Sequence, residues 1–217
     1  MKILSVSDEE VGLVYSSQIA ARFRGADIVI SCGDLPGNYL DYMVSMLNVP
    51  LYFVHGNHVR EQDERGPSGG TDLHSRVVRD RETGLLLAGV EGSLQYNFGP
   101  HQYSQEEMWL VAWGLSLRLM TNRMRFGRYL DILVTHAPAW RIHDADDRPH
   151  QGIKAFNWLI KVFQPALLLH GHVHLYRQDS VRETQVGRTK VINTFGYRFT
   201  TLELNPPSDV HVPPRAV

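Results

Sequence analysis

The sequence predicts an α/β protein with a mainly parallel sheet, on three observations. Short, β-branched apolar segments alternate with segments of helical periodicity through the first 55 residues, which is typical of strands joined by crossover helices. The chain has 217 residues, 43% hydrophobic and 21% charged, which is a globular composition. Side chains of the types that bind metals come immediately after successive apolar segments. We therefore expect one domain with its site at the carboxyl edge of the strands.

The N-terminal part of the chain contains the alternating strand and helix patterns. Residues 2–6 are short, apolar and β-branched, which predicts a buried strand. Helical periodicity over residues 16–23 stops at Gly25, a residue type that commonly ends helices. A strand, a helix and a strand follow at residues 27–31, 39–47 and 50–54. The polar, glycine-rich segment 59–75 then predicts an exposed loop of functional length.

The central part contains a long helix. After an apolar strand at residues 84–90, Ser104 and Glu107 form a capping-box pattern, which predicts a helix running to about residue 124. Apolar side chains recur every four residues along it, and we expect this stripe to face the core: Trp109, Trp113 and Leu117. The arginines that follow fit a charge run at the helix end, with phosphate neutralisation as the alternative: Arg123, Arg125 and Arg128.

The C-terminal part returns to the alternating pattern. A strand, a polar loop, a helix and a strand are predicted at residues 131–135, 141–151, 155–163 and 166–170. Residues 189–194 and 198–204 predict a closing antiparallel pair. The proline-rich tail 205–217 is expected to be irregular, so we expect a single domain over residues 1–204 followed by this tail.

Charge and cysteine content exclude several classes of protein. The 22 Lys and Arg against 23 Asp and Glu give a net charge of −1, which speaks against an extended nucleic-acid groove. Cys32 is the one cysteine, so an internal disulfide is impossible and a reducing compartment fits. The N-terminal apolar run is too short for a signal peptide, and no stretch approaches the ~18 apolar residues of a membrane span. We expect a cytoplasmic protein without a membrane partner.

Metal-type ligands follow five of the predicted strands. In chain order they are Asp8 and Glu10, Asp34, Asn57 with His58, His136, and His172 with His174. Carboxylate, imidazole and amide groups suit Mn, Fe or Zn rather than a thiolate site. About seven ligands exceed one tetrahedral site, and two ions ~4 Å apart can clamp a phosphoryl displacement. Gly33, Gly56 and Gly171 each precede a ligand and let the backbone turn closely around the ions.

These motifs resemble the calcineurin-like metallophosphoesterase superfamily, whose pattern is Asp-x-His, Gly-Asp, Gly-Asn-His, His and Gly-His-x-His at strand ends. The resemblance covers roughly residues 1–204 and implies a four-layer α/β/β/α sandwich of two mixed sheets with the helices outside. It also implies two divalent transition-metal ions, with Mn favoured and Fe or Zn as alternatives. The first would bind Asp8, Glu10 and His174, the second Asn57, His136 and His172, with Asp34 bridging both.

The resemblance implies metal-dependent hydrolysis of a phosphoric ester. A hydroxide bridging the two ions would attack phosphorus in line, and the ions would neutralise the developing charge. His58 would hydrogen-bond the phosphate or protonate the leaving oxygen, and Asp34 would hold both ions in place.

Two positions depart from the family pattern. Position 10 is Glu where relatives have His; in an extended strand end Glu10 would share a side with Asp8 and reach the first ion. The alternative is that Glu10 does not bind and the first site is weak or empty. With Glu10 bound, three carboxylates against two divalent ions leave a formal +1, which favours a phosphodiester over a monoester. Neither Gly37 nor Val59 supplies the carboxylate that orients the catalytic His in many relatives.

The remaining histidines are expected to have other roles. His170 and His55 are predicted to be packed or to support the ligands. Those in the polar loops are expected to be solvated, with a place at the mouth of the site as the alternative: His74, His101, His143 and His150.

Two rival functions stay open. One is a nuclease of the same superfamily, which would need a basic, aromatic-lined groove. The other is a non-catalytic metal-binding interaction module, a class that tends to lose its ligands. We expect a small phosphorylated substrate as the partner, and a homo-oligomer is compatible with the sequence.

Overall fold

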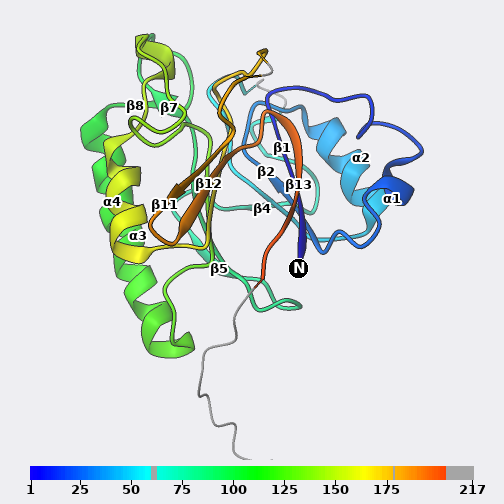
Figure 1. Ribbon diagram of the computed structural model, residues 1–217, viewed down its shortest axis with the longest axis horizontal. Helices are drawn as coiled ribbons and strands as arrows, with labels where there is room; N and C mark the ends of the chain where they lie inside the picture. The colour runs from blue at the N-terminus through cyan, green and yellow to red at the C-terminus, as the bar shows by residue number, and fades with distance from the viewer. Residues whose placement is uncertain (60–62, 178, 204–217) are drawn as a thin grey trace, which may run out of the picture.

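Two mixed β-sheets lie face to face between two pairs of helices in the computed structural model (Figure 1). The structure describes residues 1–59, 63–177 and 179–203. The predicted tail 205–217 lies outside the described residues, as does part of the predicted loop 59–75. The predicted four-layer sandwich of two mixed sheets is confirmed.

The first sheet has five strands in the order β13-β1-β2-β3-β4. Their bounds are Gly196–Thr201 (β13), Lys2–Ser7 (β1), Ile28–Ser31 (β2), Leu51–Phe53 (β3) and Thr71–Asp72 (β4). All neighbours are parallel except β13, which runs antiparallel to β1. Helices α1 (Ile19–Arg22) and α2 (Gly37–Leu47) cover its outer face.

The second sheet has six strands in the order β11-β12-β10-β9-β6-β5. Their bounds are Glu183–Val186 (β11), Thr189–Asn193 (β12), Leu167–His170 (β10), Ile132–Thr135 (β9), Leu86–Val90 (β6) and Val77–Arg79 (β5). Its outer face is covered by α3 (Gln105–Phe126) and α4 (Lys154–Phe163). Short strands β7 (Ser93–Leu94) and β8 (Gln102–Tyr103) pair separately, and a 3₁₀ turn covers Arg148–His150.

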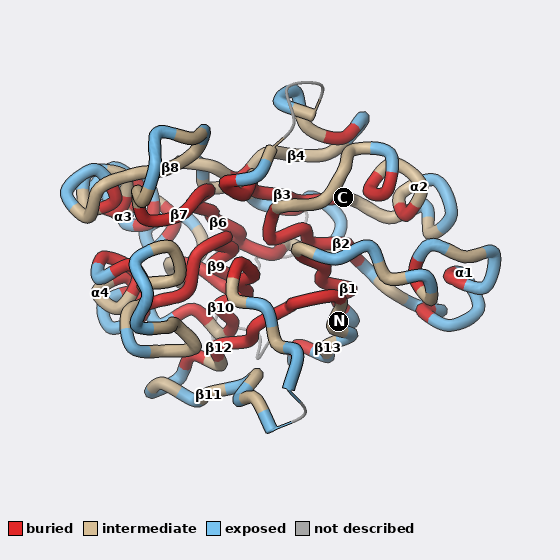
Figure 2. The backbone as a smooth tube through the Cα atoms, turned by 90° about the horizontal axis from the view of Figure 1, so that it is seen from above, coloured by how far each residue is buried: buried red, intermediate tan, exposed pale blue. Residues whose placement is uncertain are grey.

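The central strands of each sheet are buried on both faces, which explains why they are continuously apolar rather than alternating. In β2, Ile28 and Ile30 pack between the sheets, while Val29 packs toward the helices α1 and α2. In β9, Val134 lies between the sheets and Leu133 faces α3 and α4. The strands therefore form the buried centre seen in Figure 2.

The predicted antiparallel pair of residues 189–194 and 198–204 is wrong. β12 runs parallel to β10 in one sheet, whereas β13 pairs with β1 in the other. The chain crosses between the sheets at Thr194, whose hydroxyl lies 2.9 Å from Ser7 Oγ and 2.9 Å from the His170 carbonyl oxygen. Those two partners belong to different sheets, so Thr194 joins the sheets at this edge.

The predicted core stripe of α3 is also wrong. Trp113 is 54% exposed and Leu117 is 74% exposed, and Trp109 is only partly buried. The buried face is formed instead by Met108, Ala112, Leu115 and Leu119. Helix α3 therefore carries two apolar stripes, and the sheet and α4 take the one with the smaller side chains.

The arginines at the end of α3 stabilise the helix and its connection to β9. Arg123 and Arg125 lie in the last turn, where cations interact favourably with the helix dipole. Arg128 forms an ion pair with Asp131 at 2.8 Å and donates to the carbonyl oxygen of Gly84. Within residues 1–59, 63–177 and 179–203, no helix combines the length and apolar character needed to cross a membrane.

Candidate metal centre

The carboxyl ends of strands from both sheets meet at one edge of the sandwich. Asp8 follows β1, Asp34 follows β2 and Asn57 follows β3, all in the first sheet. His136 follows β9 and His172 follows β10 in the second sheet. Residues separated by up to 164 positions therefore face one another, as the strand-end argument requires.

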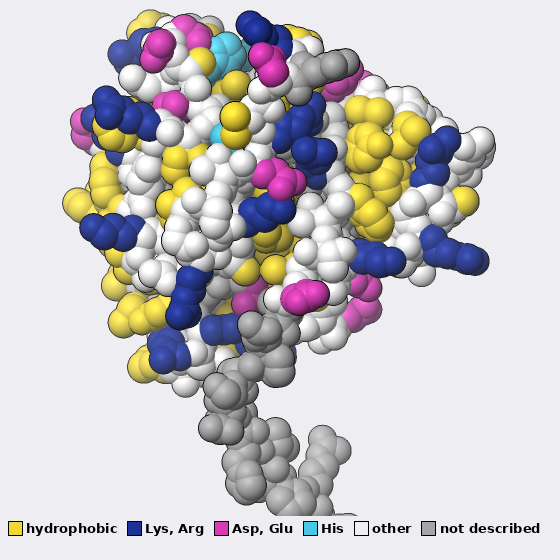
Figure 3. Space-filling model, in the orientation of Figure 1, with side chains coloured by type: hydrophobic (Ala, Val, Ile, Leu, Met, Phe, Trp, Pro, Cys, Tyr) yellow, Lys and Arg dark blue, Asp and Glu magenta, His cyan; other side chains and the backbone are white. Residues whose placement is uncertain are grey.

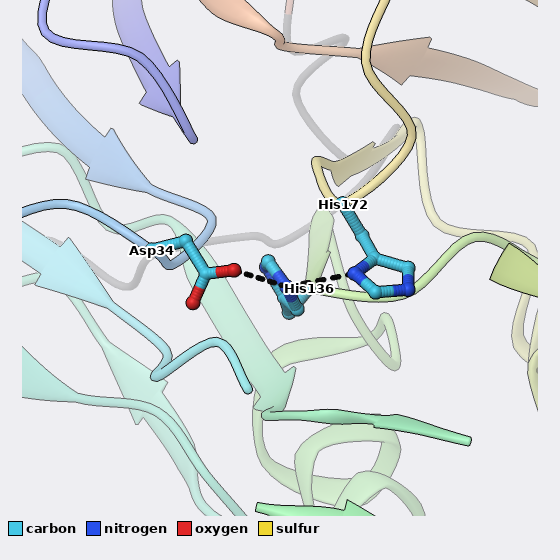
Figure 4. Close-up of side chains that lie close together, drawn as sticks. All are labelled: Asp34, His136 and His172. Atoms are coloured by element: carbon cyan, nitrogen blue, oxygen red, sulfur yellow. Dashed lines mark hydrogen bonds and ion pairs between the residues drawn. The ribbon is translucent and has the colours of Figure 1, made fainter. Parts of the chain in front are cut away.

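Asp34, His136 and His172 form the tightest group of ligand atoms (Figure 4). One ligand atom from each lies within 4.8 Å of the other two. His136 Nε2 is 3.2 Å from Asp34 Oδ2 and 3.2 Å from His172 Nδ1. The His136 ring is fully buried, and it lies between the other two side chains.

The outer nitrogens of both rings are fixed by backbone carbonyls. His136 Nδ1 lies 2.7 Å from the Cys32 carbonyl oxygen, and His172 Nε2 lies 2.7 Å from that of Pro149. Since a carbonyl only accepts, each of these nitrogens donates its N–H. The inner nitrogens therefore point their lone pairs at a shared space beside Asp34 when both rings are neutral. This arrangement, with each ligand ring held by its second nitrogen, is typical of metal-bound histidines and fits a divalent ion.

Asn57 completes this group. Its Oδ1 lies 3.1 Å from His136 Nε2, and its Nδ2 donates to the Tyr96 hydroxyl at 3.1 Å. The tyrosine thereby holds the outer end of the amide in place while Oδ1 faces the other ligands. Sequence reasoning did not single out Tyr96, because one tyrosine in a loop carries no pattern that links it to a distant Asn.

The charges of this group are coupled. Burial alone would lower the pKa of His136, but the neighbouring Asp34 carboxylate raises it to about 9. Burial alone would raise the pKa of Asp34, but the charge and hydrogen bond of His136 hold it below its usual value. Burial and the nearby His136 lower the pKa of His172 to about 3. A proton on His136 Nε2 thus faces three acceptor atoms, Asp34 Oδ2, Asn57 Oδ1 and His172 Nδ1. A metal cation in place of this proton could contact all three atoms and His136 Nε2.

Asp8 and His174 form a looser group. Both carboxylate oxygens of Asp8 accept the His172 backbone N–H, each at 3.0 Å. His174 Nε2 is 3.9 Å from Asp8 Oδ1, and the His174 side chain is 42% exposed. Its Nδ1 lies 2.7 Å from the Tyr176 hydroxyl, and its ring stacks on Phe195. Burial raises the pKa of Asp8, as expected for a carboxyl group whose charge is removed from water.

Glu10 lies apart from these ligands. The strand ends at Ser7, and Asp8 adopts a left-handed backbone with φ of 65°. The extended strand end that would place Glu10 on the same side as Asp8 is therefore absent, and Glu10 is exposed near the Tyr39 hydroxyl. A bond from Glu10 to the first ion would need the segment after Asp8 to move.

The backbone of the ligand loops is held in uncommon conformations. Besides Asp8, Asp34 and His172 have positive φ, a left-handed conformation that costs energy in residues with a Cβ and that clusters at functional sites. At Gly56, a Cβ would lie 1.9 Å from Asp34 Oδ1, and at Gly171 it would lie 2.5 Å from Asp8 Oδ2. Only glycine allows these two carboxylates to approach the backbone so closely.

His58 stands at the entrance. It is exposed, and its backbone N–H donates to Asp34 Oδ1 at 2.9 Å. It lines a cavity of about 210 Å³ together with Asp34 and Asp63. The Asp63 carboxylate accepts the Gly37 backbone N–H at 3.0 Å. A carboxylate therefore lies beside position 37 although the residue there is glycine.

Several loop histidines are less solvated than expected. His74 and His101 surround the buried Glu91, with His101 Nδ1 2.9 Å and His74 Nδ1 3.7 Å from Glu91 Oε1. Hydrogen bonding to Glu91 raises the pKa of His101. His143 Nδ1 lies 3.0 Å from His170 Nε2, and His170 is fully buried as predicted for a packed histidine. These contacts support the loops around the site. The paired residues lie far apart in the sequence, so no local pattern could have predicted the pairs.

Comparisons with known proteins agree with this architecture. The sequence profile of the calcineurin-like phosphoesterase family matches residues 6–176. The crystal structure of TT1561 of Thermus thermophilus is similar with a TM-score of 0.58 and 17% identity, over 90% of this chain and 89% of that chain. GAP50, the anchor in the inner membrane complex of Plasmodium, is similar with a TM-score of 0.51 and 14% identity, over 89% and 70% of the two chains. No curated protein sequence matches. Since the family profile covers most of the chain, and the fold of these structures agrees with it, the chain belongs to the calcineurin-like phosphoesterase family.

Proposed function

We propose that the protein hydrolyses a phosphoric ester of a small molecule with two divalent transition-metal ions, Mn being favoured over Fe or Zn. The observation that carries the proposal is the convergence of Asp34, Asn57, His136 and His172 ligand atoms around one space. Oxygen and imidazole ligands without a thiolate suit these metals. When bound, such ions lower the pKa of a water molecule and neutralise charge on the phosphoryl oxygens.

The residues of the chain then have distinct roles. Asp34 has one oxygen toward His136 and the other on the His58 backbone N–H, which holds the carboxylate in a fixed orientation. Asp8 and His174 would hold the first ion, and the second would bind Asn57, His136 and His172. His58 is exposed beside Asp34, where it can donate a proton to the leaving oxygen.

The size and charge of the site support a small phosphorylated substrate. The cavity beside Asp34 and His58, about 210 Å³, is small and suits a small phosphorylated molecule better than a large one. Preference for a diester depends on Glu10: with Glu10 bound the formal charge of the centre is +1, and with Glu10 free Asp8 and Asp34 alone leave +2. Glu10 is exposed, so the ester preference of the centre depends on whether Glu10 moves to the first ion.

The experiment uses the full chain, stripped with a chelator and reloaded with Mn. Metal content is measured first, and then hydrolysis of bis(4-nitrophenyl) phosphate and of 4-nitrophenyl phosphate, with Asp34→Asn purified in parallel as a control for contaminating phosphatases. We expect Mn-dependent turnover that the variant lacks. Two bound ions without turnover of either ester would contradict the proposal and favour a binding module; cleavage of plasmid DNA without turnover of small esters would favour a nuclease.

A further inference from the structure

The solvent-facing side of α3 carries a continuous apolar stripe that the fold itself does not use. Five side chains on it are between 53% and 83% exposed: Leu110, Trp113, Leu117, Met120 and Met124. Figure 3 shows hydrophobic side chains along the left edge of the molecule, where α3 lies in Figure 1. Single exposed apolar residues are ordinary, but a stripe along one helix face marks an interaction surface.

The spacing of the stripe is that of a helix-pairing seam. Its residues are separated alternately by three and four positions, which is the a/d pattern of a heptad repeat. From Leu110 to Met124 the seam is about 21 Å long at 1.5 Å per residue. The buried face of α3 follows a different set of positions, so packing against the sheet does not explain the repeat.

Gly114 gives an independent indication. It lies in the middle of α3 beside Trp113, it is exposed, and a Cβ added there would meet nothing within 4 Å. Glycine is among the least favourable residues inside a helix, and the described part of the chain leaves open space at this position. Close approach of a second helix at this point would give the glycine a role.

The charges at the two ends of α3 favour a second copy of the same helix as the partner. Glu106 and Glu107 lie in its first turn, and Arg123 and Arg125 lie in its last turn. Two copies of α3 packed antiparallel would bring the acidic end of each helix next to the basic end of the other. Opposed helix dipoles add to this complementarity. A surface that is complementary to itself in this way is suited to a twofold dimer.

We infer that the stripe on α3 docks against the same stripe of a second copy of this chain, with the two helices antiparallel. The twofold axis passes near the middle of the helix, so that Leu117 faces Trp113 of the second copy and Leu110 faces its Met120. Gly114 then lies beside the axis. The stripe contains none of the proposed metal ligands, so the dimer leaves the candidate site uncovered.

The first test is the mass of the full chain by sedimentation equilibrium at micromolar concentrations. We expect twice the mass of one chain. Leu117→Glu should weaken the dimer by about tenfold or more, because it places an unpaired charge in the seam. Val181→Glu is the matched control, since Val181 is 63% exposed and lines a pocket with Arg141 and Leu175, none of whose lining residues belongs to α3. A wild-type monomer at all concentrations, including one whose stripe binds lipid vesicles or another protein, would overturn the inference, as would a dimer that Leu117→Glu leaves intact.

A second test checks the orientation by oxidative cross-linking of single-cysteine substitutions. The native Cys32 is buried, so it contributes little background. Gly114→Cys lies near the axis and should form an intermolecular disulfide, whereas Met124→Cys lies far from its counterpart in an antiparallel pair and should not. Cross-linking of both variants would show a parallel pair, and cross-linking of neither would place the dimer contact elsewhere; each result overturns the inference.

Discussion

The two halves of the candidate metal centre differ in how firmly they are held. Around His136, the ligand atoms of Asp34 and His172 are 3.2 Å away, and backbone carbonyls fix both rings. Around Asp8, the nearest histidine ring nitrogen is 3.9 Å away on the exposed His174 side chain, and Glu10 is exposed as well. The ligands around His136 are already close together without an ion, whereas those around Asp8 must move closer to bind one.

This difference predicts unequal affinities. Ordering an exposed side chain costs on the order of 1–2 kcal/mol, which reduces affinity by about tenfold for each side chain that must be fixed. The half around His136 should therefore bind its ion first and release it last. The half around Asp8 should exchange its ion readily, and activity should follow occupancy of this weaker half.

The largest effect is expected where the halves meet. Asp34→Asn should remove both ions and lower turnover by about 10³-fold or more, because in the proposed centre this carboxylate alone bridges both ions. Metal content by mass spectrometry and hydrolysis of an aryl phosphodiester measure the two effects. Asp179→Asn, at an exposed ion pair with Arg177, is the matched control and should change neither. Full metal content in Asp34→Asn would rule out a shared carboxylate.

Removing one histidine from each half tests the comparison directly. His136→Ala should lower the affinity for the tighter ion by about 100-fold or more, since it removes a preorganised ligand. His174→Ala should lower the affinity for the weaker ion by about tenfold and leave the tighter ion in place. Calorimetric titration with Mn²⁺ resolves the two steps. Equal losses of metal affinity in the two variants would mean that the two halves are equally preorganised.

His58 should affect turnover without affecting either half. His58→Ala should retain both ions and lose about 10² to 10⁴-fold in kcat, the range typical of a lost general acid. The measurement is metal stoichiometry beside kcat for substrates whose leaving groups differ in pKa. The loss should be smallest for the best leaving group. Loss of an ion in this variant would make His58 a ligand instead.

The pH dependence of metal binding should distinguish the halves. Since the pKa of His136 is raised to about 9, its Nε2 carries a proton at neutral pH, and an ion must displace that proton. Affinity of the tighter half should therefore rise with pH until about pH 9 and then level off. Titrations in buffers of different ionisation enthalpy should show about one proton released at neutral pH. Binding without proton release would show that His136 is neutral in the metal-free protein.

The smallest expected effect concerns Glu10. Glu10→His should raise the ratio of monoester to diester hydrolysis several-fold if Glu10 reaches the weaker ion, because the centre gains one positive charge. Glu10→Gln serves as a second variant that removes the charge without adding a ligand of the family type. An unchanged ratio in both variants, with both ions bound, would leave Glu10 at the surface where the structure places it.

Much of the architecture was predictable, because strand ends converge whatever lies between them. The alternation over residues 2–54 predicted β1, β2 and β3, and the polar residues after each strand predicted the ligand edge. The short strands β4, β7 and β8 were missed, since two residues show no periodicity. The partners of β12 and β13 were wrong, because a local pattern does not say which sheet a strand joins.

The site was predictable only to the level of ligand type. Strand-end position identified His136, but not the carbonyl of Cys32 that fixes its ring or the Tyr96 that holds Asn57. The position of Glu10 was misjudged because the left-handed turn at Asp8 has no signature in the sequence. On α3, periodicity revealed an apolar stripe at Trp113 but could not say that a second stripe would be the buried one.

The pairing of β1 with β13 has a consequence for how the protein folds. Lys2 lies opposite Thr201, so the first strand gains its edge partner only after the chain has been synthesised as far as Thr201. Contacts of such long range make folding slow, since a large loop must close before they form. The same delay applies to formation of the candidate metal centre, because the Asp8 carboxylate contacts the His172 backbone only when both sheets are joined. The half of the candidate centre around Asp8 can therefore form only after the two sheets have joined. A nascent chain that lacks β13 exposes the unpaired edge of β1 to chaperones or to aggregation.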